Sequence, residues 1–349
     1  MISTLSLCPT CYKKIPASIQ IQDGMVVMTK TCDVHGPFSA IVERDPQHFS
    51  NFYRHGTMGR NSTIIIHAHD GCNMKCSWCY YRVGSEPNKP ASYYHNLLNY
   101  PYRGYNLLLS GGEPTIRSDY FEFVKELYDL GWAPSSITNM IKLADPEFFK
   151  RIQAPEFISD ENILRFAVSM HHPANYSVEI FEQKMKAMEN IEQAKQKVMC
   201  AMFSIQSLDE LKYIKEWYTH TKHCYKMLRI RTMFRNWANK DDASQQIFLS
   251  DLHKAFLSEF GDLNPIQSDR VEHSNMYCLY LSMDDGMDVS LSSAPTVDNV
   301  DYHLCSRPVY MLANDGRCYP VPLAQIVNEG YEKGWNSGMP LQTGGATCG

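Results

Sequence analysis

The stretch that decides the fold is HAHDGCNMKCSWCYYR, residues 67–82. Three of the chain's twelve cysteines, Cys72, Cys76 and Cys79, lie within it with the spacing CxxxCxxC. Structural sites for a single metal ion usually take four protein ligands, so three thiols need an explanation. They can hold three corners of a 4Fe–4S cluster and leave one iron without a protein ligand. The alternative is a zinc site that His67 or His69 completes.

A series of alternating strand and helix patterns surrounds and follows this stretch. Six short apolar segments are typical of strands, at 63–69, 105–111, 135–140, 164–170, 197–205 and 227–234. Amphipathic stretches typical of helices lie at 118–131, 177–196, 207–221 and 243–261. The alternation predicts an α/β fold with a parallel sheet, open or curled into a partial (β/α)6 barrel.

Polar residues follow the ends of the predicted strands, which is where parallel sheets carry their active sites. The three cysteines follow the first strand, and SGGEPT, residues 110–115, follows the second. The later strands end near Thr138, Asn139, Ser169, His171, His172, Ser204, Gln206, Arg229 and Arg231. We therefore expect one edge of the sheet to carry the chemistry.

The cysteine motif, followed about thirty residues later by GGEP at 111–114, resembles the radical S-adenosylmethionine (SAM) superfamily. The resemblance covers roughly residues 60–260. It implies that SAM chelates the free iron, and that reductive cleavage of SAM gives a 5′-deoxyadenosyl radical that abstracts hydrogen from a substrate. It also implies an electron donor such as flavodoxin or ferredoxin. The class of substrate stays open: it is a small metabolite, a lipid or a peptide. Whether SAM is consumed or regenerated stays open as well.

The resemblance assigns roles to single residues. Trp78 matches an aromatic position that contacts adenine. Gly111, Gly112 and Glu113 match the motif that holds the methionine amino group of SAM, and a carboxylate suits an ammonium. Ser169 matches a position that bonds the SAM ribose, and its alternative role is a cap on the next helix.

Other residues at the same edge are assigned by their chemistry. A guanidinium can bind a carboxylate in bidentate fashion, so Arg229 or Arg231 is expected to pair with the SAM carboxylate. Thr138 and Asn139, after the third strand, join the expected SAM-binding set.

His171 and His172 have two interpretations. Imidazole changes its charge near neutral pH, which makes both residues candidates for proton transfer or substrate contact. The alternative is a turn before Pro173, because proline restricts the residue that precedes it.

Residues 1–45 carry a second cysteine pattern, CPTC followed by CDVH. Between the two motifs, apolar and polar residues alternate on both sides of Asp23-Gly24, a pair that favours a two-residue hairpin turn. Such a hairpin would bring the motifs together as a structural Cys3His site, with zinc as the first choice of metal and iron as the second. This ribbon resembles the radical SAM subgroup that includes archaeal tetraether lipid synthase. The expected ligands are Cys8, Cys11, Cys32 and His35.

Residues 263–349 are expected to form a C-terminal extension that caps the substrate. Many radical SAM enzymes bind auxiliary iron–sulfur clusters in such an extension, and Cys305 and Gly316 fit the opening of their pattern. The second cysteine of that pattern is replaced by Val321. Two interpretations therefore stay open for the four cysteines of this region: they bind an auxiliary cluster, or they are small buried thiols. These cysteines are Cys278, Cys305, Cys318 and Cys348.

Composition bounds the remaining possibilities. The 349 residues are 44% hydrophobic and 20% charged, as in globular enzymes. The net charge of −5 and the lack of a basic run give no reason to expect nucleic acid as a partner. No apolar run is long enough to span a membrane. The start of the chain lacks the pattern of a signal peptide, and its many cysteines suit a reducing compartment, so we expect the cytoplasm.

These observations predict three parts: a zinc-ribbon-like domain at 1–45, a radical SAM core at 60–262 and the extension at 263–349. The favoured function is a radical SAM enzyme. The rival hypothesis is a non-catalytic module that binds zinc or iron–sulfur clusters for protein interaction.

Overall fold

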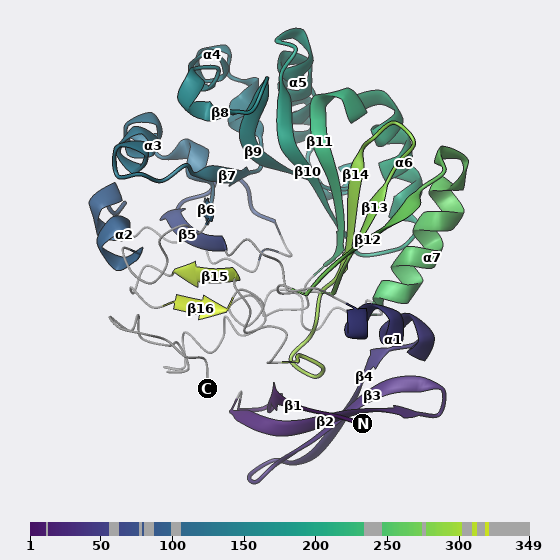
Figure 1. The fold of residues 1–349 in the computed structure, drawn as a ribbon. Helices are drawn as coiled ribbons and strands as arrows, with labels where there is room; N and C mark the ends of the chain where they lie inside the picture. The colour runs from purple at the N-terminus through teal and green to yellow at the C-terminus, as the bar shows by residue number, and fades with distance from the viewer. Residues whose placement is uncertain are drawn as a thin grey trace.

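The computed structural model describes residues 1–11, 13–55, 63–76, 79, 87–98, 106–233, 246–273, 277–301, 309–312 and 318–320. A curved sheet with helices on its outer side forms the main body, and a small separate sheet lies beside it (Figure 1). The α/β fold with a parallel sheet, preceded by a small β domain, is confirmed.

The N-terminal sheet is antiparallel and its strands follow one another in sequence order. Its strands are β1 (Ile2–Leu7), β2 (Lys14–Gln22), β3 (Met25–Cys32) and β4 (Gly36–Glu43). Asp23 and Gly24 both have positive φ, at 48° and 74°, which is the backbone that a tight two-residue hairpin needs. The predicted hairpin is therefore confirmed. Helix α1 (Pro46–His55) leads away from this sheet.

The six predicted core strands are present and parallel, in the spatial order β11-β10-β9-β7-β6-β5. They are β5 (Thr63–His69), β6 (Asn106–Gly111), β7 (Ser135–Thr138), β9 (Ile163–Met170), β10 (Lys197–Ile205) and β11 (Tyr225–Thr232). The short β8 (Ile158–Ser159) pairs with β9. The third strand ends two residues earlier than predicted, because Met140 adopts a left-handed backbone with φ 62°.

Helices cover the convex side of this sheet (Figure 1). They are α2 (Ala91–Leu98), α3 (Tyr120–Asp129), α4 (Pro146–Ile152), α5 (Val178–Gln193), α6 (Glu210–Thr221) and α7 (Leu249–Phe260). The prediction that the last helix begins at 243 is wrong, because Phe248 is still extended, with ψ 160°. Alternate strand residues such as Leu109, Val168 and Phe203 are buried against the helices. Their neighbours therefore face the concave side.

Short 3-10 turns link several of these elements. They are η1 (Pro114–Ile116), η2 (Ile141–Ala144), η3 (Pro155–Phe157), η4 (Pro173–Asn175), η5 (Lys222–Cys224) and η6 (Gly261–Leu263). Among the helices, α5 begins where Ser177 Oγ accepts a hydrogen bond from Ile180 N at 3.4 Å. Ser177 therefore caps this helix, and the alternative prediction that Ser169 caps it is wrong.

Strands from beyond residue 263 extend the core sheet at both of its edges. They are β12 (Ile266–His273), β13 (Tyr277–Ser282), β14 (Asp288–Ser293), β15 (Val309–Leu312) and β16 (Cys318–Pro320). β14 pairs in parallel with β11, and β15 pairs in parallel with β5. The predicted boundaries between the three parts stay a prediction, but the sheet itself is shared between the last two.

The tail cysteines are described only in part. Cys278 lies on β13, and Cys318 begins β16, of which only the backbone is described. Cys305, Cys348 and Val321 lie outside the described residues. The auxiliary cluster stays a prediction.

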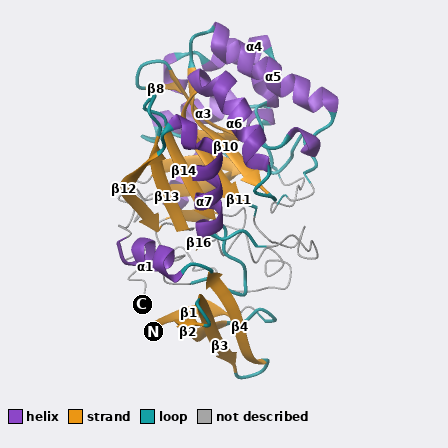
Figure 2. Cartoon of the chain, turned by 90° about the vertical axis from the view of Figure 1, so that its right-hand side faces the viewer, coloured by secondary structure: helices purple, strands orange, loops and turns teal. Residues whose placement is uncertain are grey.

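The small sheet lies against the core sheet at the side where the parallel strands end (Figure 2). Thr4 Oγ1 donates to Asp301 Oδ1 at 2.6 Å, beyond the end of β14. Ser250 Oγ donates to Glu43 Oε1 at 2.5 Å, at the start of α7. Because the crossover helices of such a sheet begin where its strands end, both contacts lie at that edge. Among the described helices, none has the length and apolar content needed to cross a bilayer.

Candidate metal and SAM site

The cysteine triad begins a loop directly after β5. All three thiols are partly buried, and Cys79 N donates to Cys76 O at 3.2 Å. Burial, together with repulsion from the neighbouring Cys79 and Cys72, raises the pKa of Cys76 to about 12. Positive charge placed among these thiols would offset both effects. The donor set therefore fits a metal centre.

The spacing of the triad favours a cluster over a single ion. In the described part of the chain, groups of metal-ligand atoms that converge within 4.8 Å of one another are confined to the N-terminal ribbon. The triad and its neighbouring histidines do not converge in this way, as a zinc site would require. A 4Fe–4S cluster gives each thiolate its own iron and needs no common point. Of the two candidate histidines, His69 has its Nδ1 2.7 Å from Asn88 Oδ1.

The two glycines after β6 pack against the start of the cysteine loop. Gly112 N donates to His69 O and Glu113 N donates to Gly71 O, both at 2.8 Å. A Cβ atom on Gly112 would lie 2.0 Å from Gly71 O, and Gly111 has φ 119° with its Cβ position 2.3 Å from His69 O. Only glycine fits at both positions. The glycines thus allow the turn to approach the backbone of the loop closely.

The Glu113 side chain joins the ends of β6 and β7. It is 1% exposed, and its Oε1 accepts hydrogen bonds from Thr115 Oγ1 at 2.6 Å and Thr138 Oγ1 at 2.8 Å. Its Oε2 accepts from Asn139 N at 2.6 Å. Burial raises the pKa of Glu113, and these donors oppose that rise. The carboxylate thus stabilises the glycine turn, against which the cysteine loop packs.

Lys184 on α5 was missed by sequence reasoning. Its side chain is fully buried, and Nζ donates to Asn139 O and Ser169 O, both at 2.8 Å. Burial lowers the pKa of Lys184 to about 8, while Cys76 and Glu113 act to raise it. One signal was available: Lys184 lies three, four and seven residues before Ala187, Met188 and Ile191, on the buried face of the helix.

Arg117, also missed, holds both ends of the cysteine loop. Its Nη1 donates to Ala68 O at 2.8 Å, before the triad, and its Nη2 donates to Lys89 O at 2.9 Å, after it. Its Nε donates to Asp119 Oδ1 at 2.7 Å, and the guanidinium lies 3.7 Å from the centre of the Phe123 ring. Arg117 is 4% exposed, so these hydrogen bonds are buried inside the protein.

The candidate histidines lie where β9 ends and differ in their surroundings. His171 is buried and its Nδ1 accepts from Ser204 N at 3.1 Å. Burial, together with the charges of Lys184 and Arg231, holds the pKa of His171 well below its usual value, so the ring is neutral. His172 Nδ1 accepts a hydrogen bond from Ala174 N at 3.3 Å. His172 thereby caps η4, so the expected turn is present and begins at Pro173.

The predicted site residues thus form connected groups. The turn of Gly111 to Glu113 contacts the cysteine loop, Thr138 and Asn139, and Ser169 meets Asn139 through Lys184. Arg231 donates from Nε to Ser204 Oγ at 2.8 Å, close to His171. Trp78 lies outside the described residues.

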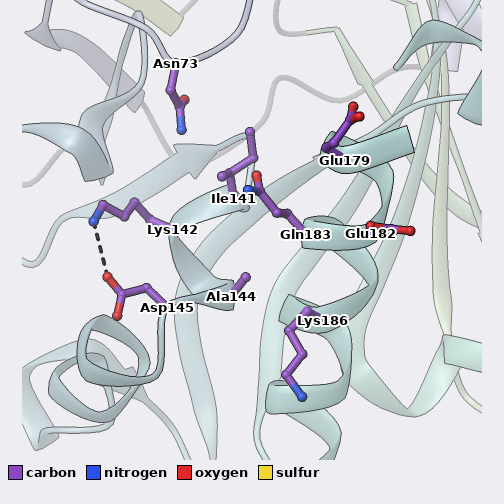
Figure 3. Close-up of a pocket in the computed structure, with 9 residues that line it drawn as sticks. All are labelled: Asn73, Ile141, Lys142, Ala144, Asp145, Glu179, Glu182, Gln183 and Lys186. Atoms are coloured by element: carbon purple, nitrogen blue, oxygen red, sulfur yellow. Dashed lines mark hydrogen bonds and ion pairs between the residues drawn. The ribbon is translucent and has the colours of Figure 1, made fainter. Parts of the chain in front are cut away.

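A pocket of about 630 Å³ opens outside this site, between η2 and α5 (Figure 3). Asn73, next to Cys72, reaches it from the cysteine loop. Its walls are charged, and Lys142 and Asp145 there form an ion pair at 3.3 Å. None of the predicted SAM-binding residues lines it. The pocket therefore borders the cysteine loop without including those residues.

The ribbon brings its four expected ligands together. Cys8 follows β1 and Cys32 ends β3, so the two turns that carry the ligands lie at one end of the small sheet. The Sγ atoms of Cys8 and Cys32 each lie 3.5 Å from His35 Nδ1, and the Sγ atoms of Cys11 and Cys32 are 4.0 Å apart. Tetrahedral zinc requires about 3.6 Å and about 3.8 Å for these separations.

The protonation of the ribbon also suits a metal. Hydrogen bonds from the backbone N–H groups of Val34 and His35 lower the pKa of Cys32 to about 6. A thiolate is the form that binds metal, so this ligand is prepared for it. The residues fit a structural zinc ion.

Replacing both Cys8 and Cys11 with alanine should release about one metal ion per chain and lower Tm by about 5 °C or more, because structural zinc contributes folding energy. Metal analysis and thermal unfolding measure both effects. Cys224→Ala, at a buried thiol away from both sites, is the control. The core iron should be unchanged. Retention of the metal by the double variant would contradict the assignment.

Parts of the chain resemble known proteins. Residues 2–44 match the family model described as the HMPTM N-terminal zinc ribbon domain. The chain is 29% identical to 7,8-dihydro-6-hydroxymethylpterin dimethyltransferase of Methanocaldococcus jannaschii, in a match that covers 43% of this chain and 36% of the relative. The chain thus spans about a third of the length of this curated relative.

Solved structures also resemble the chain. SuiB of Streptococcus suis bound to its precursor peptide SuiA covers 80% of this chain and 64% of its own, with a TM-score of 0.53 and 11% identity. SuiB bound to S-adenosylmethionine covers 79% and 63%, with a TM-score of 0.50 and 13% identity. The predicted resemblance to the radical SAM enzymes is confirmed at the level of the fold, which the chain shares with a protein solved in complex with S-adenosylmethionine.

Proposed function

We propose that the protein is a radical SAM enzyme that binds a 4Fe–4S cluster through Cys72, Cys76 and Cys79 and abstracts hydrogen from an organic substrate. One observation carries the proposal. The triad follows β5 on a loop that packs on the glycine turn after β6, at the edge of the sheet where the parallel strands end. Active sites of parallel sheets lie at this edge. The SAM-bound structure that shares the fold supports the choice of ligand.

The chemistry supplied by the cluster and SAM, when bound, is reductive cleavage of SAM to methionine and a 5′-deoxyadenosyl radical, with the electron from a flavodoxin or ferredoxin. The protein supplies position and a dry environment. Arg117 fixes both ends of the cysteine loop, and Glu113 fixes the turn beneath it. Lys184 ties the ends of β7 and β9 together. Each of these three side chains is buried, so the edge is preorganised.

Glu113→Gln tests whether the turn belongs to the SAM site. The new amide has no charge to pair with the SAM ammonium that the resemblance places beside it, and its NH2 group cannot accept the hydrogen bond from Asn139 N. Loss of charge-assisted hydrogen bonds of about 1.5–3 kcal/mol should weaken SAM binding about ten- to a hundredfold. Isothermal titration with SAM and an iron assay are run on the same sample. Iron content should stay the same, because Glu113 is not a ligand.

The control is Glu122→Gln, on the exposed face of α3, where the carboxylate pairs with the exposed Arg151. It should leave SAM affinity unchanged, since exposed pairs contribute little. Unaltered affinity in Glu113→Gln would make SGGEPT a structural turn alone. Loss of iron would make Glu113 a support of the cluster instead.

A further inference from the structure

Arginines lie on the concave face of the sheet, on β11. Leu228 and Ile230, on the same strand, are fully buried among the helices, so the alternate residues Arg229 and Arg231 face the other way. On β14, Val289 and Leu291 are likewise buried in the helix-facing core.

The register extends this face across two further strands. Arg229 pairs with Met202 on β10 and Ser290 on β14, and Arg231 pairs with Ser204 and Ser292. Because paired residues of neighbouring strands share a face, the arginines are flanked by neutral side chains, three of them hydroxyls. The buried cation Lys184 and the neutral His171 lie nearby.

The Ser290 hydroxyl belongs to a set of buried side-chain polar atoms that lack a hydrogen-bond partner among the described residues. Its side chain is 0% exposed, and in the part of the chain that the structure describes its Oγ has no hydrogen-bond partner. Buried hydroxyls are nearly always paired, and an orphan one calls for a reason. A bound ligand on the concave face would supply the missing partner.

The arginines lie on a different strand from those that carry the triad and the glycine turn. In the resemblance, the amino and carboxylate groups of SAM both bind the iron held by the triad, beside β5 and β6. The sheet order β6-β7-β9-β10-β11 places the arginines four strands away. At about 4.8 Å per strand this is about 19 Å along the sheet. The buried cation close to Cys76 is Lys184.

We propose that Arg229 and Arg231, flanked by Ser204, Ser290 and Ser292, bind an oxyanionic group of the substrate, a phosphate or a carboxylate. This inference rests on the proposed function, because it names the substrate class of the same site. Side chains two residues apart on a strand are separated by about 6.6 Å, so two guanidinium groups can enclose one such anion. Guanidinium groups bind both anions in bidentate fashion.

The test uses the full-length, reconstituted protein. Inorganic phosphate and succinate are titrated separately by calorimetry, against sodium chloride at matched ionic strength. The variants are the double variant Arg229→Gln/Arg231→Gln and Ser290→Ala, and the control is Arg151→Gln, at an exposed arginine on α4. SAM affinity and SAM cleavage without substrate are measured on each.

One of the two anions should bind saturably to the wild type and the control, and the anion that does so distinguishes phosphate from carboxylate. The double variant should bind it at least about tenfold more weakly, with unchanged SAM affinity. Ser290→Ala should bind it about two- to tenfold more weakly, yet unfold no more readily, because it removes an unpaired buried hydroxyl.

Three outcomes overturn the inference: no saturable binding of either anion, unchanged binding in the double variant, or a tenfold loss of SAM affinity in that variant with anion binding intact. The last would assign the arginines to the SAM carboxylate. Absence of SAM cleavage in every protein, with arginine-dependent anion binding intact, would contradict the proposed function and leave the anion site standing.

Discussion

Cys76→Ala is expected to abolish reductive SAM cleavage, with at least a loss of about a hundredfold, and to remove most of the iron from the core. Two thiols cannot replace three in holding a cluster that keeps one iron open. The measurement is 5′-deoxyadenosine formed under dithionite, together with iron and zinc content. Zinc in the ribbon should be retained, because its ligands lie on a separate sheet.

The control for this variant is Cys224→Ala. Cys224 is 2% exposed and lies in η5, among side chains of the helix-facing core. A generic effect of losing a buried thiol would appear in both variants, whereas loss of the cluster should appear in Cys76→Ala alone. Full SAM cleavage by Cys76→Ala would rule out the assigned ligand set.

Gly112→Ala should have an effect of similar size without touching a ligand. The new Cβ would lie 2.0 Å from Gly71 O, so the loop must move away and its hydrogen bonds to the turn must break. The first cysteine of the triad, Cys72, directly follows Gly71. We therefore expect at least about a tenfold loss of SAM cleavage and a lower iron content. Iron assay and cluster absorbance measure the effect on the loop directly.

Gly261→Ala is the matched control, because nothing lies within 4 Å of the Cβ position there and the backbone is helical, with φ −60°. It should leave iron and Tm unchanged or raise Tm slightly, since alanine restricts the unfolded chain. If Gly112→Ala keeps full iron and activity, the close packing of turn and loop has no role in the site.

The fold was predictable where the chain repeats a strong local pattern. The bounds of β5 and β10 are those predicted, because continuous apolar, β-branched segments are typical of buried parallel strands. The ribbon ligands were predictable because Asp23-Gly24 dictates a hairpin that places two short motifs side by side. Both predictions depend only on neighbours in the sequence.

The rest depends on partners distant in the sequence. β15 pairs with β5 and β14 with β11, and no local pattern says which edge a late strand joins. The inward turn of Glu113 depends on donors from the next strand, at Thr138 and Asn139. A charged residue that satisfies its charge through distant backbone carbonyls, as Arg117 does, resembles a surface residue in the sequence.

The central claim is that the triad and the turn beside it form a reductive SAM-cleaving site. The most direct test is to reconstitute the full-length protein anaerobically with iron and sulfide, add SAM and dithionite, and quantify 5′-deoxyadenosine by mass spectrometry. We expect a brown protein that forms 5′-deoxyadenosine only when SAM and reductant are both present. A colourless protein that holds zinc at both cysteine motifs and forms none would contradict it, and would favour a non-catalytic metal-binding module.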